Sequence, residues 1–220
     1  MRTRTLADIM QQLMKAESHY MKHWPKDIRP MEIDWHDRMH NFGAWPFGPG
    51  GAPRDFYFEN SDWFLAHNWG NQRMLDRARK MHSEKDTTYW LRLLDISPLA
   101  KLDMDHAFVG NILPGYKEGP AAGLMSNNPE YLEDSKSCFF AQLDILRPGR
   151  IIVLGGDSES LLRRFLKGRQ LEVEVVIIMH PSARACNWGG NKEEWLSRQA
   201  TRIMTRQADV PCPGSGRRRA

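Results

Sequence analysis

The stretch Val173-Glu174-Val175-Val176-Ile177-Ile178-Met179 runs directly into His180-Pro181-Ser182-Ala183-Arg184, and it decides the fold class. All but one of its first seven residues are apolar, which is typical of a strand buried on both faces of a parallel sheet. In such sheets, ligands bind in the crevice beyond the carboxyl ends of the strands. The turn that begins at His180 is therefore the first place to look for chemistry.

The remainder of the chain alternates strands with helices. Three further strands are predicted at 56–66, 106–111 and 150–154. Helices are predicted at 6–24, at 87–94, from Asn128 with Pro129 in the first turn, over 157–168, and from Asn191 to about 206. This alternation predicts an α/β fold of three layers, in which a central four-stranded parallel sheet is flanked by helices.

The chain of 220 residues suits one domain with an appendage. We expect a helix and an aromatic, Pro/Gly-rich loop over 1–54 that pack on the core, an α/β domain over 55–206, and a flexible basic tail over 207–220. Aromatic side chains such as Trp35 and Trp45 are rare in disordered linkers, so the loop is expected to cover the domain.

The composition limits the compartment and the partners. The net charge of +4 favours a polyanionic partner only weakly, and three widely spaced cysteines without a C-x-x-C pair argue against a zinc ribbon or an iron–sulfur cluster. His36 and His40 stand four residues apart, but no third metal ligand is evident. No apolar run reaches about 20 residues, and no apolar leader follows the N-terminus. We expect a cytoplasmic, nucleoid-associated monomer without membrane span, metal or cofactor.

Polar side chains follow three of the predicted strands. His180 follows the last strand, Asn111 ends the second, and Asn68 lies in a turn after the first. An amide carries both a donor and an acceptor, so Asn111 can read the Watson–Crick edge of a base. Both asparagines are equally compatible with an ordinary turn. Asp157 and Ser158, at the head of a helix, can cradle a phosphate or simply cap that helix.

These segments, in this order, resemble the uracil-DNA glycosylase superfamily over about residues 55–205. That family has a central four-stranded parallel sheet, a first motif after its first strand, and commonly His-Pro-Ser after its last. The last motif here is His180-Pro181-Ser182, and its continuation Ala183-Arg184, with Trp195 further on, looks most like the single-strand-selective monofunctional branch. The first motif is Ala66-His67-Asn68-Trp69-Gly70-Asn71, with alanine where the family usually has glycine and tryptophan where it often has proline. Its asparagine in the water-activating position, where no aspartate is present, resembles the mismatch-specific and single-strand-selective branches.

The resemblance implies a role for each motif residue. Asn68 would position the attacking water, and His180 would donate a hydrogen bond to the departing base. Asn111 would read the pyrimidine edge, Trp69 would stack on the base, and Arg184 would fill the vacated stack or hold a phosphate. The other expected substrate-binding residues are Ala66, His67, Gly70, Pro181 and Ser182.

The function expected from this resemblance is hydrolysis of the N-glycosidic bond of uracil or a related damaged base in single- or double-stranded DNA. A base in a duplex would first be flipped out of the stack. No lysine lies in the motif segments, so the enzyme would be monofunctional. The alternatives are an inactive module that binds nucleic acid or a protein, and a glycosylase for another damaged base. Catalysis requires Asn68, Asn111 and His180 to converge on one concave pocket.

Overall fold

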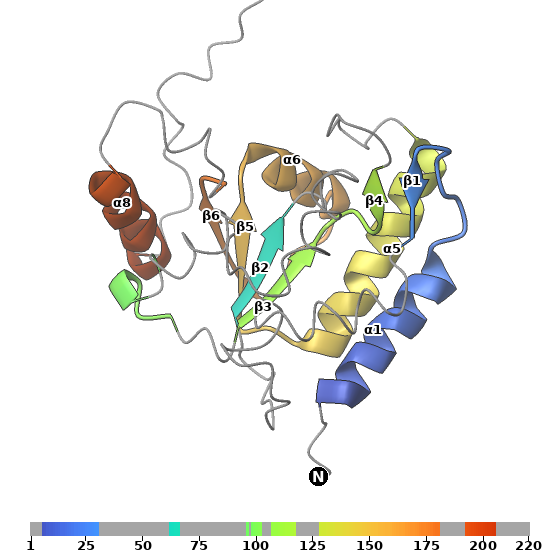
Figure 1. Ribbon diagram of the computed structural model, residues 1–220, viewed down its shortest axis with the longest axis horizontal. Coiled ribbons are helices and arrows are strands. Elements are labelled where there is room, and N and C mark those ends of the chain that lie inside the picture. The colour runs from blue at the N-terminus through green and yellow to red at the C-terminus, as the bar shows by residue number, and fades with distance from the viewer. Residues whose placement is uncertain are drawn as a thin grey trace, which may run out of the picture.

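A parallel sheet of four strands forms the centre of the structure (Figure 1). The order across the sheet is β3 (Ala107–Asn111), β2 (Asp62–Ala66), β5 (Arg150–Leu154) and β6 (Glu174–Ile178). This computed structural model describes residues 6–30, 62–66, 96, 98–102, 107–117, 128–180 and 192–205. The predicted three-layer α/β fold around four parallel strands is confirmed.

The four strands start and end level with one another. Asp62 of β2 is aligned with Ala107 on one side and with Arg150 on the other, and Arg150 is aligned with Glu174. The carboxyl ends of all four strands therefore lie at one edge of the sheet. Because neighbouring strands lie about 4.8 Å apart, the two outer strands, β3 and β6, are roughly 14 Å apart at that edge.

The central strands β2 and β5 carry the core. Trp63 and Phe64 of β2 are wholly buried. On one face, α5 (Pro129–Leu146) brings the ring of Phe139 against Trp63, with 5.4 Å between centroids. Phe165 of α6 (Gly156–Phe165) lies 6.1 Å from the same Phe139 ring. Burying each such side chain contributes about 1.5–3 kcal/mol, so this aromatic cluster fixes α5 and α6 on the sheet.

The helix α5 begins where the sequence predicts. The Oδ1 atom of Asn128 accepts a hydrogen bond from the N–H of Tyr131 at 3.0 Å, and Pro129 occupies the first helical position. At the other end, Arg147 adopts a left-handed backbone with φ of 47°, and its N–H donates to the carbonyl oxygen of Leu143 at 2.8 Å. Both ends are thus fixed by contacts within a few residues.

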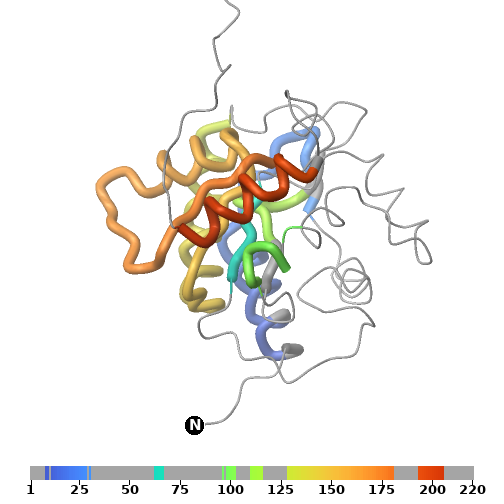
Figure 2. Tube along the Cα trace, turned by 90° about the vertical axis from the view of Figure 1, so that its left-hand side faces the viewer, coloured from blue at the N-terminus to red at the C-terminus, as the bar shows by residue number. Residues whose placement is uncertain are grey.

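The N-terminal helix α1 (Leu6–Tyr20) packs along α5 (Figure 2). The short strand β1 (Ile28–Arg29) then pairs antiparallel with β4 (Tyr116–Lys117), which follows β3. This segment is therefore attached to the sheet domain at two places, one on α5 and one beyond β3.

The predicted end of this first helix is wrong. The sequence predicts a helix to residue 24, but α1 ends at Tyr20. The cause is Asp134 of α5, whose Oδ2 atom accepts hydrogen bonds from the N–H groups of Lys22 and His23, both at 2.7 Å. A carboxylate distant in sequence thus takes the donors that would have continued the helix.

The last helix, α8 (Lys192–Thr205), packs on β6, and Figure 1 shows it on one side of the sheet with α5 and α1 on the other. β6 is one residue shorter at each end than the predicted 173–179. The predicted helix 87–94, the aromatic loop 35–47 and the tail 207–220 lie outside the described residues. Among the residues that are described, no helix is both long and apolar enough to cross a lipid bilayer.

Candidate functional site

Three of the predicted site residues lie at the carboxyl edge of the sheet. Ala66 ends β2, Asn111 ends β3, and His180 follows β6 by two residues. Open parallel sheets bind their ligands at this edge. The structure thus brings Asn111 and His180 to one edge, Asn111 at the end of one outer strand and His180 just beyond the other. The predicted site residues outside the described part of the chain are His67, Asn68, Trp69, Gly70, Pro181, Ser182 and Arg184.

Ala66 and Asn111 are direct partners in the ladder between β2 and β3. The ladder continues one step beyond them, because the N–H of Ile112 donates to the carbonyl oxygen of Ala66 at 2.8 Å. Ile112 is almost wholly buried, and so is the residue after it. The backbone of Asn111 is therefore firmly held, as a residue that reads a ligand requires.

The side chain of Asn111 has an unsatisfied polar atom. Its Nδ2 nitrogen is buried and finds no hydrogen-bond partner within the described structure. Leaving a buried donor unsatisfied costs about 1–3 kcal/mol. The indole nitrogen of Trp195 is in the same condition, but an indole offers only a donor, whereas the amide of Asn111 offers a donor and an acceptor in one plane. Such an amide is suited to a ligand with an acceptor beside a donor.

Tyr131 of α5 holds the turn that follows Asn111. Its phenol O–H donates to the carbonyl oxygen of Pro114 at 2.6 Å, and its side chain is wholly buried. Burial raises the pKa of Tyr131 far above its usual range, so the phenol stays protonated and remains a donor. Sequence reasoning missed this residue, because its partner lies 17 positions earlier in the chain and no local pattern reveals it.

His180 packs against the turn between β5 and α6. The backbone of Gly155 in that turn adopts φ of 85°, and the space where its side chain would lie is taken by the β carbon of His180. The N–H of Gly155 donates to the carbonyl oxygen of Ile178 at 2.8 Å. Gly155 follows Leu154, which is the last residue of β5 aligned with β6. The position of His180 is thus set by the neighbouring strand β5 and the β5–α6 turn. β6, the strand that leads to His180, ends two residues before it.

At the head of α6, Ser158 neither faces a phosphate site nor caps the helix, the two roles that the sequence suggested. Ser158 is wholly buried, and its hydroxyl donates to the carbonyl oxygen of Leu154 at 2.8 Å, so it faces back into β5 and is not offered to a phosphate. The residue at the cap position is Gly155, which has no side chain to cap with. Asp157 is exposed in the first turn, where its charge favours the positive end of the helix dipole.

Other reactive side chains in the described part of the chain take structural places. Cys138 is buried in α5, and burial raises the pKa of its thiol, so it is a neutral core residue. No group of three His, Cys, Asp or Glu side chains within the described ranges could hold a metal ion. Comparison with models of known protein families gives no match, and comparison with curated protein sequences gives none either.

Proposed function

We propose that this protein is a monofunctional DNA glycosylase, which hydrolyses the N-glycosidic bond of uracil or a related damaged base. The observation that carries the proposal is the buried, unsatisfied amide nitrogen of Asn111 at the carboxyl edge of the sheet. The edge of uracil presents a ring N–H between two carbonyl oxygens. An asparagine amide pairs with one half of that edge, donating through Nδ2 to a carbonyl and accepting the ring N–H at Oδ1.

His180 supplies the second half of the argument. As the glycosidic bond breaks, negative charge develops on a carbonyl oxygen of the departing base, and a hydrogen bond from an imidazole stabilises it. Removing one such donor typically slows an enzyme by about 10²–10³-fold. Asn111 ends β3 and His180 follows β6, so both stand at the carboxyl edge of the sheet, beyond which open parallel sheets bind their ligands.

The remaining roles follow the resemblance to the uracil-DNA glycosylase superfamily. Asn68 positions the attacking water, Trp69 stacks on the extruded base, and Arg184 holds a phosphate or fills the gap in the stack. An amide is a weak base, so most of the rate comes from His180 and from the positioning of the substrate. The DNA is single- or double-stranded, and the cost of extrusion is least for a base that is mismatched or unpaired.

The test is a panel of single- and double-stranded oligonucleotides that carry uracil, hypoxanthine or xanthine, with release of the base detected as an alkali-labile abasic site. We expect release of at least one base under single-turnover conditions, and a loss of about 10²-fold or more in His180→Ala. The matched control is His19→Ala, which removes an exposed imidazole from α1. If the wild-type protein releases no base from any of these substrates, the proposal fails.

A module that binds without cleaving is the second candidate. The observation that favours it is the altered first motif, with alanine at 66 and tryptophan at 69. A binding module would retain affinity for the same oligonucleotides in the absence of any abasic product. Its affinity would also fall as salt is raised, by a slope of about 0.9 for each duplex phosphate that it neutralises.

A further inference from the structure

The peptide group that joins Ile178 to Met179, just before His180, is hydrogen-bonded on both sides. Its carbonyl oxygen accepts the N–H of Gly155 at 2.8 Å. Its N–H, which points to the opposite side of the strand, donates to the Oε1 atom of Gln199 in α8 at 2.9 Å. β6 is an outer strand of the described sheet, and within the described residues a helix side chain, not a further strand, takes this N–H.

Gln199 differs from the other buried polar side chains of the described structure. Gln199 is 1% exposed, and the other two members of this group are Ser135 and Ser158. Both serines bond to the carbonyl oxygen four residues earlier, as helix serines commonly do. Gln199 instead bridges from α8 to a residue 20 positions earlier. Burying a long polar side chain costs rotamer entropy and desolvation, so this bond stabilises one particular arrangement of the strand end.

We propose that Gln199 is a positioning residue, which fixes the site of His180 by holding the main chain immediately before it. Gly155 supports the other side, because its N–H donates to Ile178 and its lack of a side chain leaves the space in which the β carbon of His180 lies. The main chain just before His180 is then held between the β5–α6 turn and α8. As regards catalysis, this inference rests on the proposed glycosylase activity, since a donor must be placed to within about 0.5 Å to act on a developing charge.

The first test is Gln199→Met, which keeps the length and volume of the side chain but removes the acceptor. We expect the amide hydrogen of Met179 to exchange at least ~10-fold faster and the imidazole proton resonances of His180 to move. We also expect single-turnover base release to fall by ~10-fold or more, at unchanged affinity for DNA. Gln142→Met is the matched control, because Gln142 is a partly buried glutamine of α5 whose amide bonds to the sulfur of Cys138, four residues earlier in the same helix.

Two further variants keep the inference testable. Gln199→Glu retains an acceptor oxygen and should restore the protection of Met179 and much of the rate. If Gln199→Met does not fold, the same measurements are made on Gln199→Asn. Its side chain is one methylene shorter, so its amide oxygen should no longer reach the N–H of Met179. Unchanged Met179 exchange and unchanged His180 resonances in a folded variant would overturn the inference. These spectroscopic readouts need no substrate, so they decide the role of Gln199 even if the wild-type protein releases no base.

Discussion

The backbone of Gly155 and the side chain of His180 occupy adjoining space with no room for another atom between them. A β carbon added to Gly155 would lie 2.9 Å from the β carbon of His180, which is closer than two such carbons approach in proteins. The backbone of Gly155 also has φ of 85° and ψ of 162°, a conformation that is essentially restricted to glycine. Two independent constraints therefore require glycine at this position.

The first prediction is that Gly155→Ala lowers the free energy of unfolding by about 1–3 kcal/mol and slows base release beyond the loss of folded protein. Two controls separate the causes. Gly168→Ala shares the positive φ but has open space around it, so it should cost stability and leave release unchanged. Gly156→Ala has neither problem and should be neutral or slightly stabilising. Urea unfolding and single-turnover release measure the two effects, and equal release by the Gly155 and Gly168 variants would contradict the prediction.

The second prediction concerns the unsatisfied amide of Asn111. Asn111→Leu replaces the buried Nδ2 donor with an apolar group of similar shape, so the protein should become more stable, by up to about 3 kcal/mol. Base release should be lost at the same time, because leucine cannot pair with the edge of a pyrimidine. Thermal and urea unfolding check the first effect and single-turnover release the second. A variant that is less stable yet fully active would show that the amide serves the fold and not a ligand.

The fold could be predicted from the sequence where the signals are local. The start of α5 is encoded by Asn128 and Pro129 themselves, and the buried strands by continuous apolar runs such as 150–154. The end of α1 could not be predicted, because it depends on Asp134, more than 100 residues away. Whether that carboxylate meets Lys22 depends on how two helices pack, and the sequence of neither helix reveals it.

The candidate site divides in the same way. That Asn111 and His180 lie at one edge follows from the direction of parallel strands, which the alternation of strands and helices already implies. The supports of His180 do not follow from it. Gly155 appears in the sequence as an ordinary end of a strand, and Gln199 as one polar residue of an amphipathic helix. Their roles arise only from contacts between elements that are remote in sequence.

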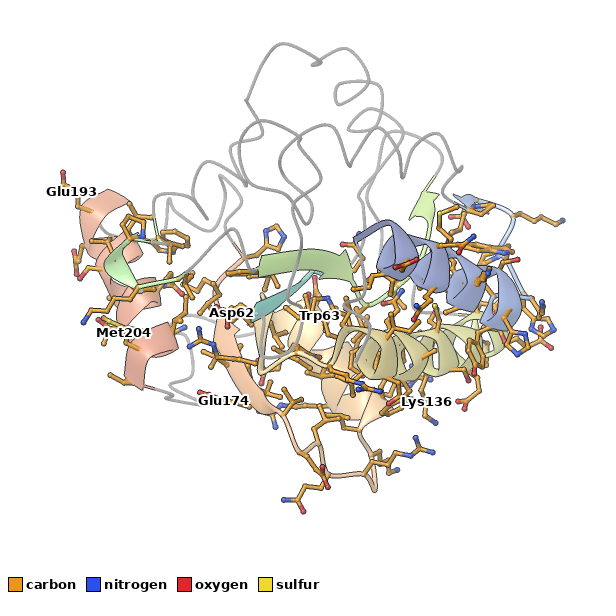
Figure 3. All side chains as sticks on the ribbon, turned by 90° about the horizontal axis from the view of Figure 1, so that it is seen from below. Asp62, Trp63, Lys136, Glu174, Glu193 and Met204 are labelled. Carbon is orange, nitrogen blue, oxygen red and sulfur yellow. The ribbon has the colours of Figure 1, made fainter. Side chains whose placement is uncertain are left out.

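The third prediction concerns the amino edge of the sheet, where Asp62 (labelled in Figure 3) and Arg150 begin adjacent strands. The guanidinium donates from Nε and Nη2 to the two carboxylate oxygens at 2.8 and 2.9 Å, and this hydrogen bonding raises the pKa of Arg150. Both side chains are largely buried, so Arg150→Met leaves a carboxylate without its partner and should cost about 2 kcal/mol. Adding Asp62→Leu should recover part of that loss, as a double-mutant cycle of urea unfolding measures.

A matched control for this pair is Arg163→Met. Arg163 and Glu159 form an exposed pair on α6 at 2.8 Å, and exposed pairs of this kind contribute less than about 1 kcal/mol. The amino edge lies at the opposite end of the strands from Asn111 and His180, so base release per folded molecule should be unchanged in all of these variants. A double variant no more stable than Arg150→Met would mean that the charge of Asp62 does not cause the loss.

The last prediction is a dependence of stability on pH that arises from Asp134. Its Oδ2 atom accepts the N–H groups of Lys22 and His23, and it lies 3.1 Å from Nδ1 of His23. Partial burial acts to raise the pKa of this carboxyl, but the hydrogen bonds outweigh it and hold the pKa of Asp134 below its usual value of 3.8. A carboxyl whose pKa is lower in the folded state stabilises the fold above the unfolded value, and this contribution is lost as pH falls through the folded value.

Urea unfolding of the wild type and of Asp134→Asn, from neutral pH to about pH 2, tests this dependence. The variant should be less stable at neutral pH, because its neutral amide is a weaker acceptor for the N–H groups of Lys22 and His23. The two stability curves should begin to converge below about pH 4, where the carboxyl of the unfolded wild type becomes protonated, and should meet once the pH has fallen below the lowered pKa of Asp134 in the folded state. Glu133→Gln is the control, since Glu133 is exposed on the same helix and pairs with Lys136, three residues away. Curves that stay parallel over the whole range would show that the charge of Asp134 does not hold the end of α1 against α5.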